Sequence, residues 1–354
     1  MTYKQQILEL LNGSPFPIDL NIVLEGRPPS MASSEFLTNK EQGDWAEEVV
    51  FNAINDNELE YVAVKYGRSD SLSAGDDGFK RFYEEYLAEL NSIGKKPDIL
   101  IFSRKLYDSK TFDINSDEVV SQAVAALEVR SSSFLANKYD TYMSDRARNA
   151  VANCLRIKNE ILNSDLSALL KIKNGAIHSL LSTATAETFS ELDFRLSSWS
   201  SSAELKSLSQ KLKDLKENIK ILHKRDYLSI TPKLEDLALV NRWIQKYGVK
   251  HFYLQVFFDK AYIIPFKSIL EIASNPENEG KIFSVESDIK NQGKTTIKIN
   301  ARVGKEILGR VDMPSHQSEL KELSRGRLLF YVTFSGGKGY LDNNLFLSEV
   351  IGGE

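Results

Sequence analysis

The sequence predicts an α/β fold, with a mixed sheet flanked by helices, a helical insertion and a β extension at the C-terminal end. Three observations predict this class. Helix-like and strand-like patterns alternate between residues 38 and 131. Apolar residues at spacings of three and four then continue through residues 141–225, and strand-like segments return after residue 250. We therefore expect a core made of residues 1–140 and 226–354, and a separate helical subdomain at 141–225.

The core begins with an extended arm and a helix. Residues 13–34 hold much of the proline in the chain, which favours an extended arm over a helix. Thr38, followed three residues later by Glu41, predicts a capping box at the start of a helix. Apolar residues from Trp45 onwards recur at helical spacing, and we expect this helix to end near Asn57.

Three strands and a second helix follow in the predicted core. Residues 61–67 predict a strand, and residues 79–90 predict an aromatic-rich helix after a polar loop. Two further strands are predicted at residues 98–102 and 119–131, separated by a polar connection. Because both segments are rich in apolar residues, we expect them to be neighbouring strands of the core.

The segments after the insertion predict that the core resumes there. Residues 234–248 predict an amphipathic helix, and two apolar strands are predicted between residues 251 and 266. Residues 295–302 and 327–334 predict an antiparallel β extension. The glycine-rich residues 335–339 lack the spacing of a phosphate-binding loop and predict a hairpin turn.

Composition excludes several classes of protein. The chain of 354 residues has four histidines and one cysteine, Cys154, too few for a disulfide framework or a common zinc site. Cys154 has no evident base and predicts a packing residue. A net charge of -4 argues against coating nucleic acid through charge alone, so any contact with DNA must be local. No signal peptide or membrane-spanning run is apparent, and we expect a soluble cytoplasmic protein.

Two acidic residues on predicted neighbouring strands form the candidate site. Asp98 opens one strand, and Glu128 lies near the end of the next. Strand alternation places Glu128 and Arg130 on one face and Val129 on the other. If the strands pair, Asp98 lies beside Glu128, and a divalent cation such as Mg²⁺ would relieve the repulsion between the carboxylates. The backbone carbonyl of Val129 would be a third protein ligand.

The predicted site suits hydrolysis of a phosphodiester. A bound metal ion can activate water, relieve charge on the phosphate and help the leaving oxygen. Arg130 would stabilise the negative charge that develops on the phosphoryl group. Glu47 lies near the buried face of its predicted helix, where a carboxylate is costly without a partner. A metal ion or a metal-bound water would be such a partner.

The order of these acids resembles a known family. Glu47 in GDWAEE, Asp98 in PDILIF and Glu128 in LEVRSSSF resemble the PD-(D/E)XK nucleases, and ASSEFLTNKEQGDWAE and LEVRSSSF are similar to type II restriction endonucleases of the AccI kind. The resemblance covers residues 30–140 and 228–270. It implies a PD-(D/E)XK restriction-endonuclease-like core, metal binding by Asp98 and Glu128, and catalytic support from Glu47. It also implies a Mg²⁺-dependent enzyme that cuts double-stranded DNA at a specific short sequence, with a cognate DNA methyltransferase in the same cell.

The candidate site departs from this family at one position. Arg130 stands where the family pattern has a lysine, and arginine does not readily give up a proton. Arg130 therefore fits electrostatic stabilisation and not a general-base role. Lys138 is an alternative source of an amine, and we favour Arg130.

A restriction enzyme that cuts both strands of a symmetric site needs two active sites, which predicts a homodimer. The helical insertion is a candidate for the dimer interface or for a clamp on the duplex. Three alternatives stay open at this point. They are a repair or junction nuclease of the same fold, a catalytically silent DNA-binding protein, and an unrelated interaction protein.

Overall fold

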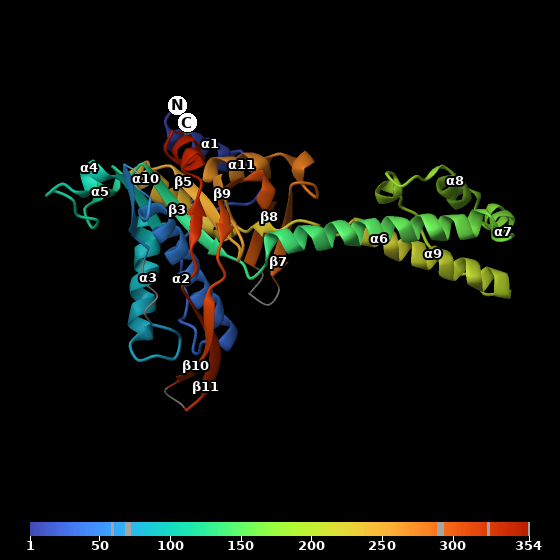
Figure 1. Cartoon of the computed structure of the whole chain (residues 1–354), viewed down its shortest axis with the longest axis horizontal. Coiled ribbons are helices and arrows are strands. Elements are labelled where there is room, and N and C mark those ends of the chain that lie inside the picture. Colours follow the sequence, from blue (N-terminus) through green and yellow to red (C-terminus); the bar gives the residue numbers. More distant parts are fainter. Residues whose placement is uncertain (58–59, 68–71, 289–293, 324–325, 353–354) are drawn as a thin grey trace. The chain divides into compact units, whose positions relative to one another are not determined.

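The computed structural model describes residues 1–57, 60–67, 72–288, 294–323 and 326–352 (Figure 1). The chain forms two compact units. The first contains Met1–Ala136 and Leu228–Glu354, and the second contains Asn137–Tyr227. In the described part of the chain, no helix is both long and apolar enough to span a bilayer.

A seven-strand mixed sheet forms the centre of the first unit. The first three strands of the sheet are antiparallel neighbours, the third and fourth run parallel, and the remaining pairs are antiparallel. The predicted α/β class with a mixed sheet is confirmed. In spatial order the strands are β1 (Tyr61–Lys65), β2 (Ile99–Ser103), β3 (Ala125–Ser131), β5 (His251–Val256), β6 (Ala261–Pro265), β9 (Lys305–Val311) and β12 (Gly339–Leu341).

The C-terminal β structure is divided between sheets. β9 and β12 extend the large sheet, whereas the other strands form a two-strand hairpin and a three-strand sheet. Residues 335–339 link two strands that pair with different partners, so the predicted hairpin turn is wrong and the segment crosses between sheets. The indole Nε1 of Trp45 donates to the Gly336 carbonyl at 2.9 Å and anchors this crossing. The smaller sheets contain β10 (Ser315–Glu322) and β11 (Leu328–Ser335), and β4 (Ser229–Ile230), β7 (Phe283–Asp288) and β8 (Lys294–Asn300).

Helices cover both faces of the large sheet because alternate strand residues point to opposite faces. Ile99 and Ile101 of β2 pack in one apolar cluster with residues of α2 (Ser34–Asn55). Leu100 and Phe102 pack in another cluster with Trp243 of α10 (Leu234–Tyr247). The helices of the first unit are α1 (Tyr3–Asn12), α2 (Ser34–Asn55), α3 (Phe79–Ile93), α4 (Arg104–Tyr107), α5 (Asp117–Val120), α10 (Leu234–Tyr247), α11 (Phe266–Ser274) and α12 (Asn343–Leu345).

Helix α2 begins earlier than the sequence pattern predicts. Ser33 caps it by accepting a hydrogen bond from the N–H of Phe36 at 3.0 Å. The predicted capping box at Thr38 is therefore wrong. Thr38 lies inside the helix, and its Oγ1 accepts a hydrogen bond from the N–H of Val332 at 3.1 Å. This hydroxyl ties α2 to β11 instead of capping a helix.

The strand predicted at residues 119–131 is shorter in the structure. Its first part belongs to α5, in which the N–H of Ser121 donates to the Asp117 carbonyl at 3.0 Å. β3 begins only at Ala125. Val119 and Val120 are buried, but their apolar side chains pack from the helical turn of α5 and not from the strand.

The second unit is a set of helices around its own apolar core. α6 (Ala136–Leu162) and α9 (Ala203–Leu222) run antiparallel (Figure 1). The contacts follow this order: Asn153 donates to Asn218 at 3.3 Å, and Glu160, further along α6, pairs with Lys211, which comes earlier in α9. Cys154 is a buried free thiol in this core. The role of the predicted 141–225 insertion stays a prediction. The helices are α6 (Ala136–Leu162), α7 (Leu166–Lys173), α8 (Gly175–Thr183) and α9 (Ala203–Leu222).

Candidate active site

The pairing of β2 with β3 brings Asp98 and Glu128 together. The strands are antiparallel, with Ile99 opposite Leu127. Asp98, which precedes Ile99, therefore lies beside Glu128, which follows Leu127. The N–H of Asp98 donates to the Leu127 carbonyl at 3.0 Å. The carboxylate of Asp98 then accepts a hydrogen bond through Oδ2 from the N–H of Val129 at 2.7 Å. The Asp98 side chain thus takes the place of a strand partner at the start of β2.

The backbone of β3 turns the Val129 carbonyl to the side of the strand on which Asp98 lies. The N–H groups of Ala126 and Ser132 donate to the carbonyls of Lys250, which precedes β5, and of Val256, the last residue of β5. Because the direction of backbone groups alternates along a strand, Val129 turns its N–H and its carbonyl to the β2 side. Its side chain packs in the apolar cluster on the opposite face from Glu128. The backbone oxygen therefore lies on the same side as the Asp98 carboxylate.

Glu128 is buried and uses only one of its two carboxylate oxygens. Its Oε1 lies 2.6 Å from Lys95 Nζ and 2.7 Å from an Arg130 guanidinium nitrogen. Its Oε2 is buried and has no hydrogen-bond partner. A buried carboxylate oxygen without a partner is costly. Oε2 of Glu128 is therefore an acceptor open to a ligand.

The two neighbouring carboxylates differ in their affinity for protons. Burial raises the pKa of Asp98 well above its ordinary value, and the negative charges of Glu128 and Glu47 raise it further. Burial acts in the same direction on Glu128, but the charges of Lys95 and Arg130 outweigh it and hold the pKa of Glu128 below its ordinary value. The pKa of Asp98 is thus the one that rises, whereas two cations keep the pKa of Glu128 low.

A further acid, Asp236, enters the site from the first turn of α10. Its Oδ2 lies 3.0 Å from Lys95 Nζ and 3.4 Å from Arg130. Burial raises the pKa of Asp236, but the charges of Lys95 and Arg130 dominate and lower that pKa to about 2. Asp236 is therefore ionised and shares both cations with Glu128.

All five predicted site residues line one cleft of the first unit, with a volume of about 1070 Å³. Glu47 reaches it from α2, Asp98 from the start of β2, and β3 contributes the other three. Lysines and further acids complete the lining, including Lys40, Lys95, Lys96, Lys233, Asp44 and Asp236. Acidic side chains that suit a metal ion and cationic side chains that suit a phosphate thus line the same cleft.

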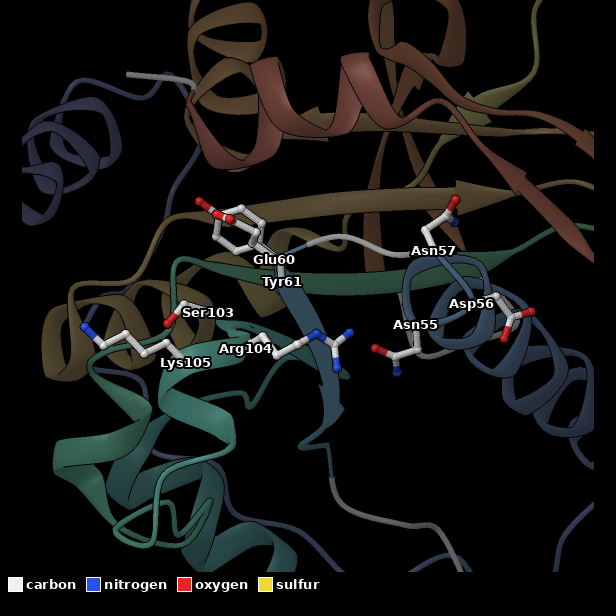
Figure 2. A pocket seen from close by; sticks show the side chains of 8 residues that line it. All are labelled: Asn55, Asp56, Asn57, Glu60, Tyr61, Ser103, Arg104 and Lys105. Carbon is white, nitrogen blue, oxygen red and sulfur yellow. The ribbon is translucent and has the colours of Figure 1, made fainter.

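A second pocket, of about 740 Å³, lies at the far end of β2 from Asp98. Figure 2 shows its lining side chains, which come from the end of α2, the start of β1 and the residues around Ser103. Five residues of strand, roughly 16 Å, separate Ser103 from Asp98. The described residues that line this pocket are Asn55, Asp56, Asn57, Glu60, Tyr61, Ser103, Arg104 and Lys105, none of them a predicted site residue.

A comparison with protein families decides the assignment. Residues 1–352 match the model of the AccI restriction endonuclease family. The chain belongs to this family. Membership in the AccI restriction endonuclease family implies an endonuclease of a restriction system that acts on DNA. The match also corrects the extent predicted from motifs: it continues through the helical insertion and the C-terminal β structure, which lack the acidic motifs. No curated protein and no solved structure gives a significant match.

The oxygen atoms of the site fit a hard divalent cation. In the described ranges, no three side chains of His, Cys, Asp or Glu lie close enough together to hold a metal. The candidate donor set is therefore two carboxylates, Asp98 and Glu128, and the Val129 carbonyl. Glu128 Oε2 is buried without a partner, as an oxygen reserved for a ligand would be. Carboxylate and carbonyl oxygens are the ligands that Mg²⁺ prefers.

The sequence patterns missed two charged residues of this AccI-family cleft. Lys95 comes three residues before Asp98, and Asp236 lies in the first turn of a helix, where acids are common. Lys95 stands two residues before the Pro97–Asp98 motif, and that closeness is a local signal for the lysine, whereas nothing local connects Asp236 to the site. Lys138, the alternative amine, belongs to the second unit, and the cleft is built by the first unit.

Proposed function

We propose that this AccI-family chain is a Mg²⁺-dependent type II restriction endonuclease with a PD-(D/E)XK core. It would hydrolyse phosphodiester bonds of double-stranded DNA at a specific short sequence. The observation that carries the proposal is the pairing of Asp98 with Glu128 on adjacent strands, in one cleft with Glu47 and Arg130.

The order of elements around the cleft supports the PD-(D/E)XK assignment. Helix α2 carries Glu47, and the antiparallel β1, β2 and β3 follow it. After the second unit, α10 crosses to β5, which pairs with β3 in parallel. The resemblance to PD-(D/E)XK nucleases depends on these parts: a helix acid, an Asp and a Glu on paired strands, and a crossover helix.

Each proposed catalytic residue has a distinct task. Asp98, Glu128 and the Val129 carbonyl would hold Mg²⁺, which when bound supplies an activated water and relieves charge on the phosphate. Arg130 presents its guanidinium to the same cleft and stabilises negative charge on the phosphoryl oxygens. Glu47 orients the attacking water from the α2 side by accepting a hydrogen bond from it.

A restriction enzyme that cuts both strands needs two such sites. We therefore propose a homodimer that cuts a symmetric sequence, protected in its host by a cognate methyltransferase. Light scattering of the protein with its duplex should give twice the mass of the chain, 40.0 kDa each, plus the DNA. A single chain bound to cleaved DNA would contradict the dimer.

The test is cleavage of a long duplex in Mg²⁺. The wild type should give discrete fragments, and Asp98→Asn and Glu128→Gln should lose cleavage by on the order of 10³-fold while still binding DNA in Ca²⁺. Asp117→Asn, which alters an exposed acid paired with Lys246, is the matched control and should cut normally.

Two results would favour the alternatives. Binding of duplex without any cleavage would favour a catalytically silent DNA-binding protein. Cleavage restricted to junctions or damaged DNA would favour a repair nuclease of the same fold.

A further inference from the structure

Four charged atoms form a closed ring beside the free oxygen of Glu128. Lys95 Nζ lies 2.6 Å from Glu128 Oε1 and 3.0 Å from Asp236 Oδ2. An Arg130 guanidinium nitrogen contacts the same two oxygens, at 2.7 and 3.4 Å. We call these four residues the charge ring. Two cations and two anions alternate around it, so its charges balance.

The backbone holds Lys95 at this place. The N–H of Lys95 donates to the Leu239 carbonyl of α10 at 3.0 Å. Gly94 has a φ of +83°, and a side chain there would lie 2.2 Å from the same carbonyl. Arg242 of α10 donates to the carbonyls of Leu90 and Asn91 at the end of α3, at 3.0 and 3.2 Å. The segment before Asp98 is therefore fixed against α10, the helix that carries Asp236.

Asp236 explains how two cations share one oxygen of Glu128. All four side chains are largely buried, with exposed fractions of 18% for Lys95, 27% for Arg130, 19% for Asp236 and 2% for Glu128. Buried charges are stable only when they are paired. Without Asp236, the two cations would repel each other over a single carboxylate oxygen. The second acid cancels that repulsion, and Glu128 Oε1 stays engaged on both sides.

The ring leaves Glu128 one orientation. Oε1 is held by two cations, so Oε2 is fixed as the oxygen that has no partner. Groups that orient a metal-binding side chain from behind strengthen metal binding by fixing the ligand before the metal arrives.

We propose that Lys95 and Asp236 are positioning residues, which with Arg130 orient Glu128 so that its Oε2 is presented to the divalent metal. This inference rests on the proposed function, because it assigns a purpose to Glu128 as a metal ligand. Lys95 acts through Glu128 and not by contact with the DNA.

The sign of a change in metal affinity tests this role. Charge alone predicts that Lys95→Met tightens metal binding, because a nearby cation is removed. Positioning predicts the opposite, since Glu128 loses part of the ring that orients it. We expect Lys95→Met to weaken Mn²⁺ binding by about tenfold, measured by calorimetry in the absence of DNA. Lys95→Arg, which keeps a cation that can donate to both acids, should stay within about threefold of the wild type.

Lys96→Met is the matched control. Lys96 lines the same cleft but pairs with Glu89 at 2.8 Å, outside the ring. Its loss should not weaken Mn²⁺ binding. The melting temperature of each variant checks that it is folded, and Lys95→Gln, which keeps a hydrogen-bond donor, replaces Lys95→Met if that variant unfolds.

The outcomes separate this inference from the proposed function. Asp98→Asn, which removes a proposed ligand, identifies the Mn²⁺ site by the loss of binding. A wild type that binds no Mn²⁺ would overturn the proposed function, and the ring's role with it. A wild type that binds Mn²⁺ while Lys95→Met binds it equally or more tightly would overturn the inference alone. A loss of DNA affinity in Ca²⁺ with metal binding unchanged would also overturn it, because Lys95 would then be a phosphate contact.

Discussion

Two glutamates, one in each unit, each hold two cations in different surroundings. Glu128 of the first unit pairs with Lys95 and Arg130, and 2% of its side chain is exposed. Glu160 of the second unit pairs with Arg156 and Lys211, and 36% of its side chain is exposed. Water can complete the hydrogen bonds of Glu160. It does not reach Glu128 Oε2, which has no partner.

Ion pairing alone therefore does not distinguish a functional acid from a structural one. Both glutamates satisfy the same electrostatic rule, since each has an opposite charge on two sides. Of these two glutamates, Glu128 alone has a buried oxygen without a hydrogen-bond partner, and such an oxygen destabilises the fold. Proteins keep such groups where a ligand offsets the cost. Removing each glutamate tests whether burial, and not pairing, separates the two sites.

Removing Glu128 is expected to have the largest effect on stability. Glu128→Ala leaves Lys95 and Arg130 buried with Asp236 as their remaining partner. We expect a loss of about 3 kcal/mol in the free energy of unfolding, limited because Asp98 can then ionise and replace part of the charge. Glu160→Ala should change this free energy by no more than the experimental error, because water solvates its cations. Urea unfolding followed by circular dichroism measures both, and equal losses would remove the distinction.

Acidic pH should reveal another buried group of the first unit. His251 is fully buried, neither ring nitrogen has a hydrogen-bond partner, and burial lowers its pKa to about 4. An unfolded histidine titrates near 6.5, so on acidification the unfolded chain binds the proton first and stability falls between pH 6.5 and 4. At pH 5 this loss is about 2 kcal/mol. His251→Leu should escape it and be more stable than the wild type at pH 5.

The second unit offers the matched histidine. His178 shares a hydrogen bond with Ser167 at 3.1 Å. His178→Leu removes that bond and should lower stability by about 1 kcal/mol, opposite in sign to the change at His251. Thermal melts of both variants at pH 5 measure the signs. A destabilised His251→Leu would show that the buried ring has a role in the native state that its contacts do not reveal.

The central pair of the site could be predicted because its geometry is local. Strand alternation relates Glu128 to Arg130, and two neighbouring apolar segments predict that β2 and β3 pair. Asp98 opens one of these segments, so the register alone places it beside Glu128. The first and last residues of helices and strands were harder to predict. Thr38 bonds to a strand that is 294 residues away, and no local pattern distinguishes that hydroxyl from a helix cap.

The charge ring could not be predicted from the sequence. Lys95 and Asp236 are 141 residues apart, and the whole second unit separates them in the chain. Each has an ordinary local explanation: a solvated lysine before a strand, and an acid in the first turn of a helix. Their meeting depends on how α10 packs against the segment that precedes β2, which is a property of the tertiary fold.

Helix α2 carries two adjacent glutamates, Glu47 and Glu48, in different surroundings. Glu47 lines the cleft, whereas the adjacent Glu48 pairs with Lys65 on the exposed side of α2. If Glu47 orients the attacking water, Glu47→Gln should slow cleavage by about 10-fold at saturating Mg²⁺. Glu48→Gln should cut at the wild-type rate. Single-turnover cleavage of a short duplex measures both rates, and equal rates would assign Glu47 a structural role.

The smallest effect is expected for the stability of Asp98→Asn, and it should be a gain. Burial and the charges of Glu128 and Glu47 raise the pKa of Asp98, so the folded protein holds this proton at pH values where the unfolded chain has released it. Stability therefore falls as the pH rises from the unfolded pKa through the folded one. Asparagine does not titrate and keeps an oxygen to accept the N–H of Val129. At pH 8 and without metal, we expect Asp98→Asn to melt a few degrees above the wild type. A lower melting temperature would show that the Asp98 carboxylate stabilises the fold without a bound cation. The repulsion between Asp98 and Glu128 would then not destabilise the metal-free protein.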